Sequence, residues 1–130
     1  MKQTLQQQLY DLTGIEMPKE KKEYKKQEYQ RGEVYMADLD GVGSEQRGIR
    51  PVVILQKNSF NRRSTTLVVA CLTTKEKKDM NCHVKLGTGQ TVLCEQIKTI
   101  DKERILGYNY TLTDYEMKMI EDAVRDHLLL

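Results

Sequence analysis

Hydrophobic and polar positions follow a β-strand pattern along most of the chain after residue 30. Some stretches alternate between apolar and polar residues, and others are apolar or β-branched throughout, as expected for half-buried and central strands. The predicted strands are 33–39, 51–56, 65–74, 82–86 and 90–100. Gly87-Thr88-Gly89 joins the last two and is typical of a hairpin turn, whereas 57–63 predicts a polar connection and 101–104 a short helical turn.

The last segment has the period of a helix instead. Thr113 followed by Glu116 fits a capping box, with the threonine as N-cap. The apolar residues behind it, Met117, Ile120, Val124 and Leu128, recur at helical spacing and predict one face packed on the sheet. Strands followed by a single terminal helix predict a mainly β (α+β) fold, either a small antiparallel barrel or a strongly curved sheet.

The first thirty residues differ in composition from the rest. Residues 1–12 predict a short helix, and Thr13-Gly14 followed by Pro18 ends it. The segment 19–30 has five lysines, three glutamates and no aliphatic residue, so it cannot bury enough apolar surface to form a core. We therefore expect an N-terminal extension over 1–30, serving as a tether, an arm or a partner-binding segment, and a single domain over 31–130.

Composition narrows the class of protein. The formal net charge is only +2, so any surface that binds nucleic acid must be a local one. The chain has no apolar run that could cross a bilayer and no signal peptide, which leads us to expect a cytoplasmic protein. Cys71, Cys82 and Cys94 lack C-x-x-C spacing and predict neither a disulfide framework nor a zinc site.

The richest chemistry lies in the segment 43–51, Gly-Ser-Glu-Gln-Arg-Gly-Ile-Arg-Pro. Its glycines permit backbone shapes that other residues resist, and Arg50 stands where this loop meets the predicted strand 51–56. An arginine fixed at such a place suits an anionic ligand such as a phosphate. The alternative is an exposed hairpin loop with solvated charges.

Strand pairing suggests a partner for Arg50. If the strands 51–56 and 65–74 pair in antiparallel fashion, their connection lies at one end, and Arg50 and Thr73 lie together at the other. A guanidinium beside a hydroxyl can bind a phosphate through its charge and through hydrogen bonds. Glu45, on the loop that leads to Arg50, could supply a carboxylate base.

Four blocks of sequence carry a resemblance to a known family. They are Arg31-Gly32-Glu33-Val34-Tyr35, the segment from Gly43-Ser44-Glu45-Gln46 through Gly48-Ile49-Arg50-Pro51-Val52-Val53, Ala70-Cys71-Leu72-Thr73, and Glu95-Gln96-Ile97-Lys98-Thr99-Ile100-Asp101-Lys102. In this order and spacing they resemble the MazF/PemK toxins of bacterial toxin–antitoxin systems. The resemblance implies an SH3-like, CcdB/PemK-type barrel and a homodimer. It also implies sequence-specific cleavage of single-stranded RNA without a metal or other cofactor.

In that chemistry the ribose 2′-hydroxyl attacks the neighbouring phosphate and leaves a 2′,3′-cyclic phosphate and a 5′-hydroxyl end. By resemblance, Arg50 is the catalytic arginine, Thr73 its partner and Glu45 the general base. The RNA-binding candidates are Ser44, Gln46, Arg47, Asn58, Thr74, Glu95 and Gln96. A cognate, MazE-like antitoxin with an extended or disordered tail would be the inhibitor.

Two other functions stay open from sequence. One is a non-catalytic, CcdB-like toxin that binds a protein such as gyrase, and the other is an inactive relative that binds RNA or protein. His83 is predicted to lie at the edge of the core or on the surface, and the alternative is a role in RNA cleavage. The lysines at 75, 77 and 78 are predicted to lie in a solvated loop, and the alternative is that they bind RNA phosphates. The extension over 1–30 and the short turn at 87–89 depart from the family pattern and leave the cut sequence open.

Overall fold

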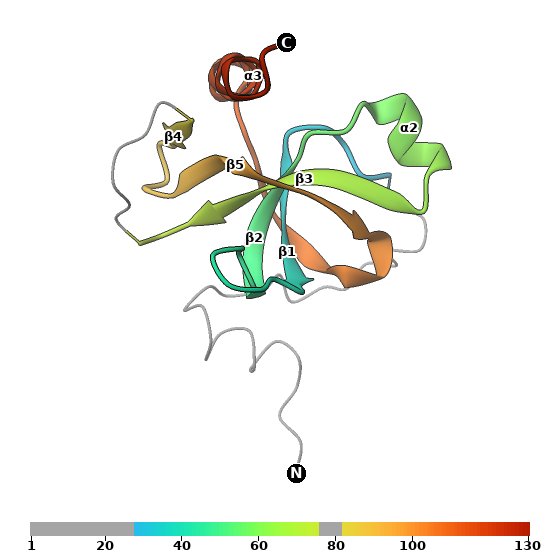
Figure 1. Cartoon of the computed structure of the whole chain (residues 1–130). Coiled ribbons are helices and arrows are strands. Elements are labelled where there is room, and N and C mark those ends of the chain that lie inside the picture. The colour runs from blue at the N-terminus through green and yellow to red at the C-terminus, as the bar shows by residue number, and fades with distance from the viewer. Residues whose placement is uncertain (1–27, 76–81) are drawn as a thin grey trace.

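The computed structural model describes residues 28–75 and 82–130 (Figure 1). Within these ranges, six strands and three short or terminal helical elements follow one another. They are β1 (Glu33–Leu39), β2 (Gly48–Ile54), α2 (Asn58–Arg63), β3 (Thr66–Thr73), β4 (His83–Lys85), β5 (Thr91–Asp101), the 3-10 turn η2 (Lys102–Arg104), β6 (Ile105–Thr111) and α3 (Asp114–Leu128). The predicted helix over 1–12 and most of the charged segment 75–79 lie outside the described residues. No helix in the described ranges has the length and apolar character needed to span a membrane.

The strands form one antiparallel sheet in the order β4-β5-β3-β2-β1-β6. Its two edge strands, β4 and β6, are not joined in a ladder, so the sheet curves like a barrel without closing. Side chains bridge the gap instead: the Tyr110 hydroxyl of β6 hydrogen-bonds the Gln90 side chain and lies 3.2 Å from Thr88 Oγ1 at the β4–β5 turn. The fold is thus the strongly curved antiparallel sheet that the strand pattern predicted.

Both faces of the sheet are buried. On one face, α3 packs its buried residues Met117, Ile120 and Ala123 against Val53 and Leu72, and Figure 1 shows this helix lying across the sheet. On the other face the strand residues cluster with Tyr29, just before β1. Because successive residues of a strand point to opposite faces, this explains why the central strands are apolar throughout rather than alternating. The second face is the one that carries the polar site described below.

The structure corrects several of the expected boundaries. β2 begins at Gly48, not at Pro51, because residues 48–50 already pair with β1. The connection 57–63 contains the helix α2, and β6 was not expected at all. In α3, Met117 and Ile120 are buried as predicted, but Leu128 is exposed and Ala123 is buried, since the stripe turns away from the sheet near the C-terminus.

The predicted capping box at the start of α3 is confirmed, and it gives a pH-dependent prediction. Thr113 Oγ1 accepts the Glu116 N–H, and the Glu116 carboxylate accepts the N–H groups of Thr113 and Gly87. The hydrogen bond from Thr113, with smaller help from Gly87, holds the Glu116 pKa below its ordinary value. A lowered folded-state pKa stabilises the protein above the unfolded-state pKa, and this stability is lost as the pH falls through the folded-state pKa.

We therefore expect Glu116→Gln to lower the free energy of unfolding by about 0.5 to 1 kcal/mol at neutral pH. The difference from the wild type should begin to shrink below the ordinary glutamate pKa of about 4.3 and should vanish only below the lowered folded-state pKa, where both side chains are neutral. Urea unfolding at a series of pH values measures it. A loss that stays the same from neutral to acid pH would contradict the role of the charge.

Candidate active site

The pairing of β2 with β3 decides where Arg50 lies. Val52 pairs with Cys71, which confirms that these strands are antiparallel neighbours. The ladder ends at this pair, and Arg50 and Thr73 lie two residues beyond it on the two strands, toward the same end of the sheet and on the same face as Val52 and Cys71. Electrostatics agree, because Arg50 and Lys98 both act on the thiol of Cys71: burial raises its pKa to about 11, and these two cations oppose the rise.

The Arg50 side chain is half-buried and presents an unused donor. Its Nε is buried and has no hydrogen-bond partner. Arg50 and Arg47 together line a surface pocket of about 350 Å³ with Asp38 and Ile49. A buried donor without a partner is unfavourable, whereas an anionic ligand that accepts from a guanidinium forms a charge-assisted hydrogen bond. The pocket therefore favours a ligand with anionic oxygens.

Thr73 ends β3 with its side chain directed into this buried face. The residue is only 7% exposed, and its Oγ1 accepts the Lys75 N–H at 3.2 Å. Because a hydroxyl can accept and donate at once, its proton stays available to a ligand oxygen. Thr74, the next residue, is exposed. The end of β3 thus offers one buried hydroxyl donor on the face of the sheet that also carries Arg50.

The loop between β1 and β2 is held in a defined shape by its own groups. The Glu45 carboxylate accepts the Val42 N–H at 2.6 Å, and the Glu45 N–H donates to the Val42 carbonyl at 3.1 Å. Gly41 is required here, because a Cβ at this position would collide with the Gln46 backbone. In the described part of the chain, no hydrogen bond or ion pair joins Glu45 to Arg50 or Arg47. In this conformation the Glu45 carboxylate stabilises the β1–β2 loop.

A β-bulge in β5 turns two further side chains toward the site. Ala70 pairs with Ile97, but its neighbour Cys71 pairs with Leu93, so residues 94–96 bulge out of the ladder. Bulges commonly redirect side chains next to functional sites. The Gln96 Oε1 accepts the Gln46 N–H at 3.3 Å and so ties the β1–β2 loop to β5.

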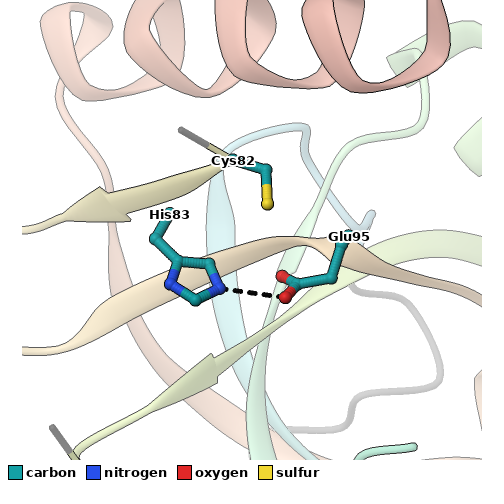
Figure 2. Close-up of side chains that lie close together, drawn as sticks. All are labelled: Cys82, His83 and Glu95. Carbon is teal, nitrogen blue, oxygen red and sulfur yellow. Dashed lines mark hydrogen bonds and ion pairs between the residues drawn. The ribbon is translucent and has the colours of Figure 1, made fainter. Parts of the chain in front are cut away.

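The Glu95 side chain of this bulge meets His83 of β4, with Oε2 2.9 Å from His83 Nε2 (Figure 2). His83 and Lys98 are the residues of this region that sequence reasoning left out of the site. Lys98 pairs with Val69 and lies close enough to Cys71 to lower its pKa. The alternation of β5 could have suggested Lys98, whereas the His83–Glu95 contact depends on a bulge that the sequence pattern does not reveal.

The remaining predicted RNA-binding residues divide into two groups. Ser44 and Arg47 are exposed on the β1–β2 loop and Thr74 at the end of β3, and of these Arg47 lines the same pocket as Arg50. Asn58 starts α2, beyond the opposite end of β2, and its Oδ1 accepts the Arg31 N–H at 2.6 Å. Asn58 is thus the predicted site residue that lies at the far end of β2, and a joint role of the others stays a prediction.

Comparison with known proteins identifies the family. Residues 30–128 match the family described as the PemK-like, MazF-like toxins of type II toxin–antitoxin systems. The chain belongs to this PemK/MazF family. The chain is 43% identical to the Endoribonuclease MazF of Staphylococcus saprophyticus over 103 residues, and this match covers 72% of the present chain and 86% of that protein.

Solved structures agree with this assignment of the PemK/MazF fold. A mycobacterial endoribonuclease in complex with its cognate antitoxin is 28% identical, with a TM-score of 0.67, and the match covers 78% of this chain and 95% of that one. The MazF of Deinococcus radiodurans is 18% identical with a TM-score of 0.71, over 78% of this chain and 96% of that one, and supports the fold alone. The expected fold class, a mainly antiparallel and barrel-like sheet with a C-terminal helix, is confirmed.

Proposed function

We propose that this PemK/MazF toxin cuts single-stranded RNA at a short sequence, with Arg50 and Thr73 holding the scissile phosphate. Membership of the family and the 43% identical endoribonuclease MazF make the chain an endoribonuclease toxin of a type II system. The observation that carries the proposed mechanism is the buried, unpartnered Arg50 Nε at the end of β2 nearest Thr73. A protein-binding, CcdB-like toxin is not favoured, because it needs neither group.

The proposed reaction is a transfer within the RNA chain. The ribose 2′-oxygen attacks the adjacent phosphorus, and the bond from phosphorus to the 5′-oxygen breaks, which leaves a 2′,3′-cyclic phosphate and a 5′-hydroxyl. Arg50 and the Thr73 hydroxyl donate hydrogen bonds to the non-bridging oxygens, on which charge develops in the pentacoordinate transition state. Because arginine rarely releases a proton, we assign Arg50 electrostatic stabilisation and not acid catalysis.

This reaction also needs a base for the 2′-hydroxyl proton and a proton for the leaving 5′-oxygen. We propose Glu45 as the base, as the family resemblance implies. Its carboxylate now accepts the Val42 N–H, so the β1–β2 loop must release it when RNA binds. The protonated carboxyl, or water, can then return the proton to the 5′-oxygen.

We propose that the bases flanking the cut are read by polar groups of the β1–β2 loop, the end of β3 and the β5 bulge. Proteins read single-stranded RNA by hydrogen bonds to the edges of splayed bases. The groups available are those of Ser44, Gln46, Arg47, Thr74, Glu95 and Gln96, whereas Asn58 would require RNA that extends to the far end of β2. The Gln96 side chain accepts the Gln46 backbone N–H, so replacing Gln96 should shift the β1–β2 loop and alter the cut sequence.

Three further properties concern the inhibitor of this toxin, its oligomeric state and its place in the cell. A mycobacterial neighbour is known in complex with its cognate antitoxin, and we propose that an antitoxin segment inhibits the present toxin by covering the Arg50 pocket. We further propose a cytoplasmic homodimer, with residues 31–130 as the toxin domain and 1–30 as an extension to it. An antitoxin tail that folds on binding can wrap a large surface and be removed by proteolysis.

The test is incubation of the purified protein with a long single-stranded RNA in excess EDTA. We expect discrete fragments with 5′-hydroxyl and 2′,3′-cyclic phosphate ends, because the proposed groups all come from the protein. Thr73→Val should slow cleavage by about 10- to 100-fold, the loss of one hydrogen bond to a charged group.

The matched control is Thr99→Val, at an exposed threonine of β5, which should leave the rate unchanged. Intact RNA after incubation with a folded protein would refute the proposed activity. Equal rates for Thr73→Val and the wild type would remove Thr73 from the mechanism.

A further inference from the structure

A second polar cluster lies between β4, β5 and the helix that covers them, and it includes Glu95, one of the groups proposed to contact RNA. It consists of Cys82, His83 and Glu95, which Figure 2 shows pointing toward one another beneath α3. Cys82 comes just before β4, and Glu95 belongs to the β5 bulge, so the bulge brings a carboxylate to a cysteine–histidine pair. This cluster is distinct from the groups that hold the scissile phosphate.

The three ligand atoms are close and buried. The cysteine sulfur, a histidine nitrogen and a carboxylate oxygen all lie within 4.8 Å of one another. His83 and Glu95 have side chains only 6% and 22% exposed. The second carboxylate oxygen, Glu95 Oε1, is buried without a hydrogen-bond partner, as is His83 Nδ1. Such buried polar groups without partners require an explanation, and binding of a cation is one.

From this geometry we propose that Cys82, His83 and Glu95 bind a Zn²⁺ ion. Zinc prefers sulfur, imidazole nitrogen and carboxylate oxygen in a tetrahedral arrangement, and a water can complete a three-residue site. With metal–ligand distances of about 2.0 to 2.3 Å, tetrahedral ligands lie roughly 3.3 to 3.7 Å apart. Small side-chain rotations bring the present cluster, at 4.8 Å or less, into that range.

The charges of the cluster also favour a cation. Glu95 Oε1 is a buried carboxylate oxygen without a hydrogen-bond partner, and a buried negative charge is costly without a positive partner. A bound Zn²⁺ supplies that charge, and the thiol proton leaves to solvent as the sulfur coordinates the metal. The ion would join the edge strand β4 to the β5 bulge and occupy Glu95, one of the groups proposed to contact RNA.

Zinc titration of the reduced, EDTA-treated and desalted protein tests this proposal. Competition with a chromophoric zinc chelator should show one ion bound per chain, and added zinc should raise Tm because it binds the folded state. The proposal also predicts that Co²⁺ gives the intense visible bands of a tetrahedral complex together with a thiolate-to-metal charge-transfer band. Cys82→Ala and Glu95→Gln should each weaken zinc binding by at least about tenfold.

The control is Cys71→Ala, which removes a buried thiol outside the cluster and should leave zinc binding unchanged. If wild-type protein binds no zinc, if its cobalt spectrum lacks the thiolate band, or if Cys82→Ala binds zinc as the wild type does, the proposal is wrong. The cobalt spectrum decides even where a variant fails to fold. RNA cleavage in EDTA is a separate measurement, so each proposal can fail without the other.

Discussion

Replacing Arg50 with alanine should reduce the rate of RNA cleavage by about 100- to 1000-fold, the usual cost of removing a donor that stabilises a charged transition state. The loss should fall mainly on kcat, because the hydrogen bonds to the phosphate strengthen as charge develops. Arg50→Lys should recover only part of the rate, since a lysine keeps the charge but not the planar fork that contacts two oxygens. The fold should remain intact, because removing the guanidinium also removes a buried donor that has no partner.

The matched control for this experiment is Arg63→Ala. Arg63 is an exposed arginine of α2, beyond the opposite end of β2, and its loss also lowers the net charge by one. We expect at most a small change in KM from the weaker attraction of RNA, with kcat unchanged. If both variants lose activity equally, Arg50 acts only through net charge, and the proposed contact with the phosphate is wrong.

Replacing Ile120 with alanine should destabilise the protein by about 2 to 5 kcal/mol, as for other large-to-small changes in a packed core. Ile120 is fully buried and lies in the cluster that joins α3 to Val53 and Leu72 of the central strands. Its removal leaves a cavity between the helix and the sheet that the neighbouring side chains can fill only in part. Urea unfolding at one fixed protein concentration measures the effect, since a dimer's stability depends on concentration.

Tyr115→Ala on the same helix is the comparison for this prediction. Tyr115 is 73% exposed, so its replacement should change the free energy of unfolding by no more than about 0.5 kcal/mol. A destabilisation by Ile120→Ala that is no larger than that of Tyr115→Ala would show that α3 does not pack on the sheet through Ile120. The account of the terminal helix as part of the core would then be wrong.

The antiparallel pairing of β2 with β3 could be predicted from the sequence because it depends on local signals, whereas the joint role of Arg50 and Thr73 stays a prediction. The two apolar strands on either side of the connection 57–63 could only pair in antiparallel fashion, and this places Arg50 and Thr73 at the same end. The capping box of Thr113 and Glu116 is equally local and is confirmed. These features needed no knowledge of distant contacts.

The parts that the sequence did not predict depend on tertiary structure. β6 contains Gly107 and two half-buried tyrosines, and its strand character comes from pairing with β1. The bulge at residues 94–96 arises from the mismatch of β5 with β3, so neither the Glu95–His83 contact nor the cluster with Cys82 could be read from spacing. The shape of the β1–β2 loop, which turns the Glu45 carboxylate onto Val42, was hidden for the same reason.

The most direct measurement is a crystal structure of the protein with an oligonucleotide of the cleaved sequence that carries a single 2′-deoxyribose at the cut site. Without that hydroxyl the chain cannot be cleaved, so the scissile phosphate stays in place. The account predicts non-bridging oxygens of that phosphate within hydrogen-bond distance of both the Arg50 guanidinium and Thr73 Oγ1. A scissile phosphate held elsewhere, with Arg50 bound only to protein groups, would contradict it.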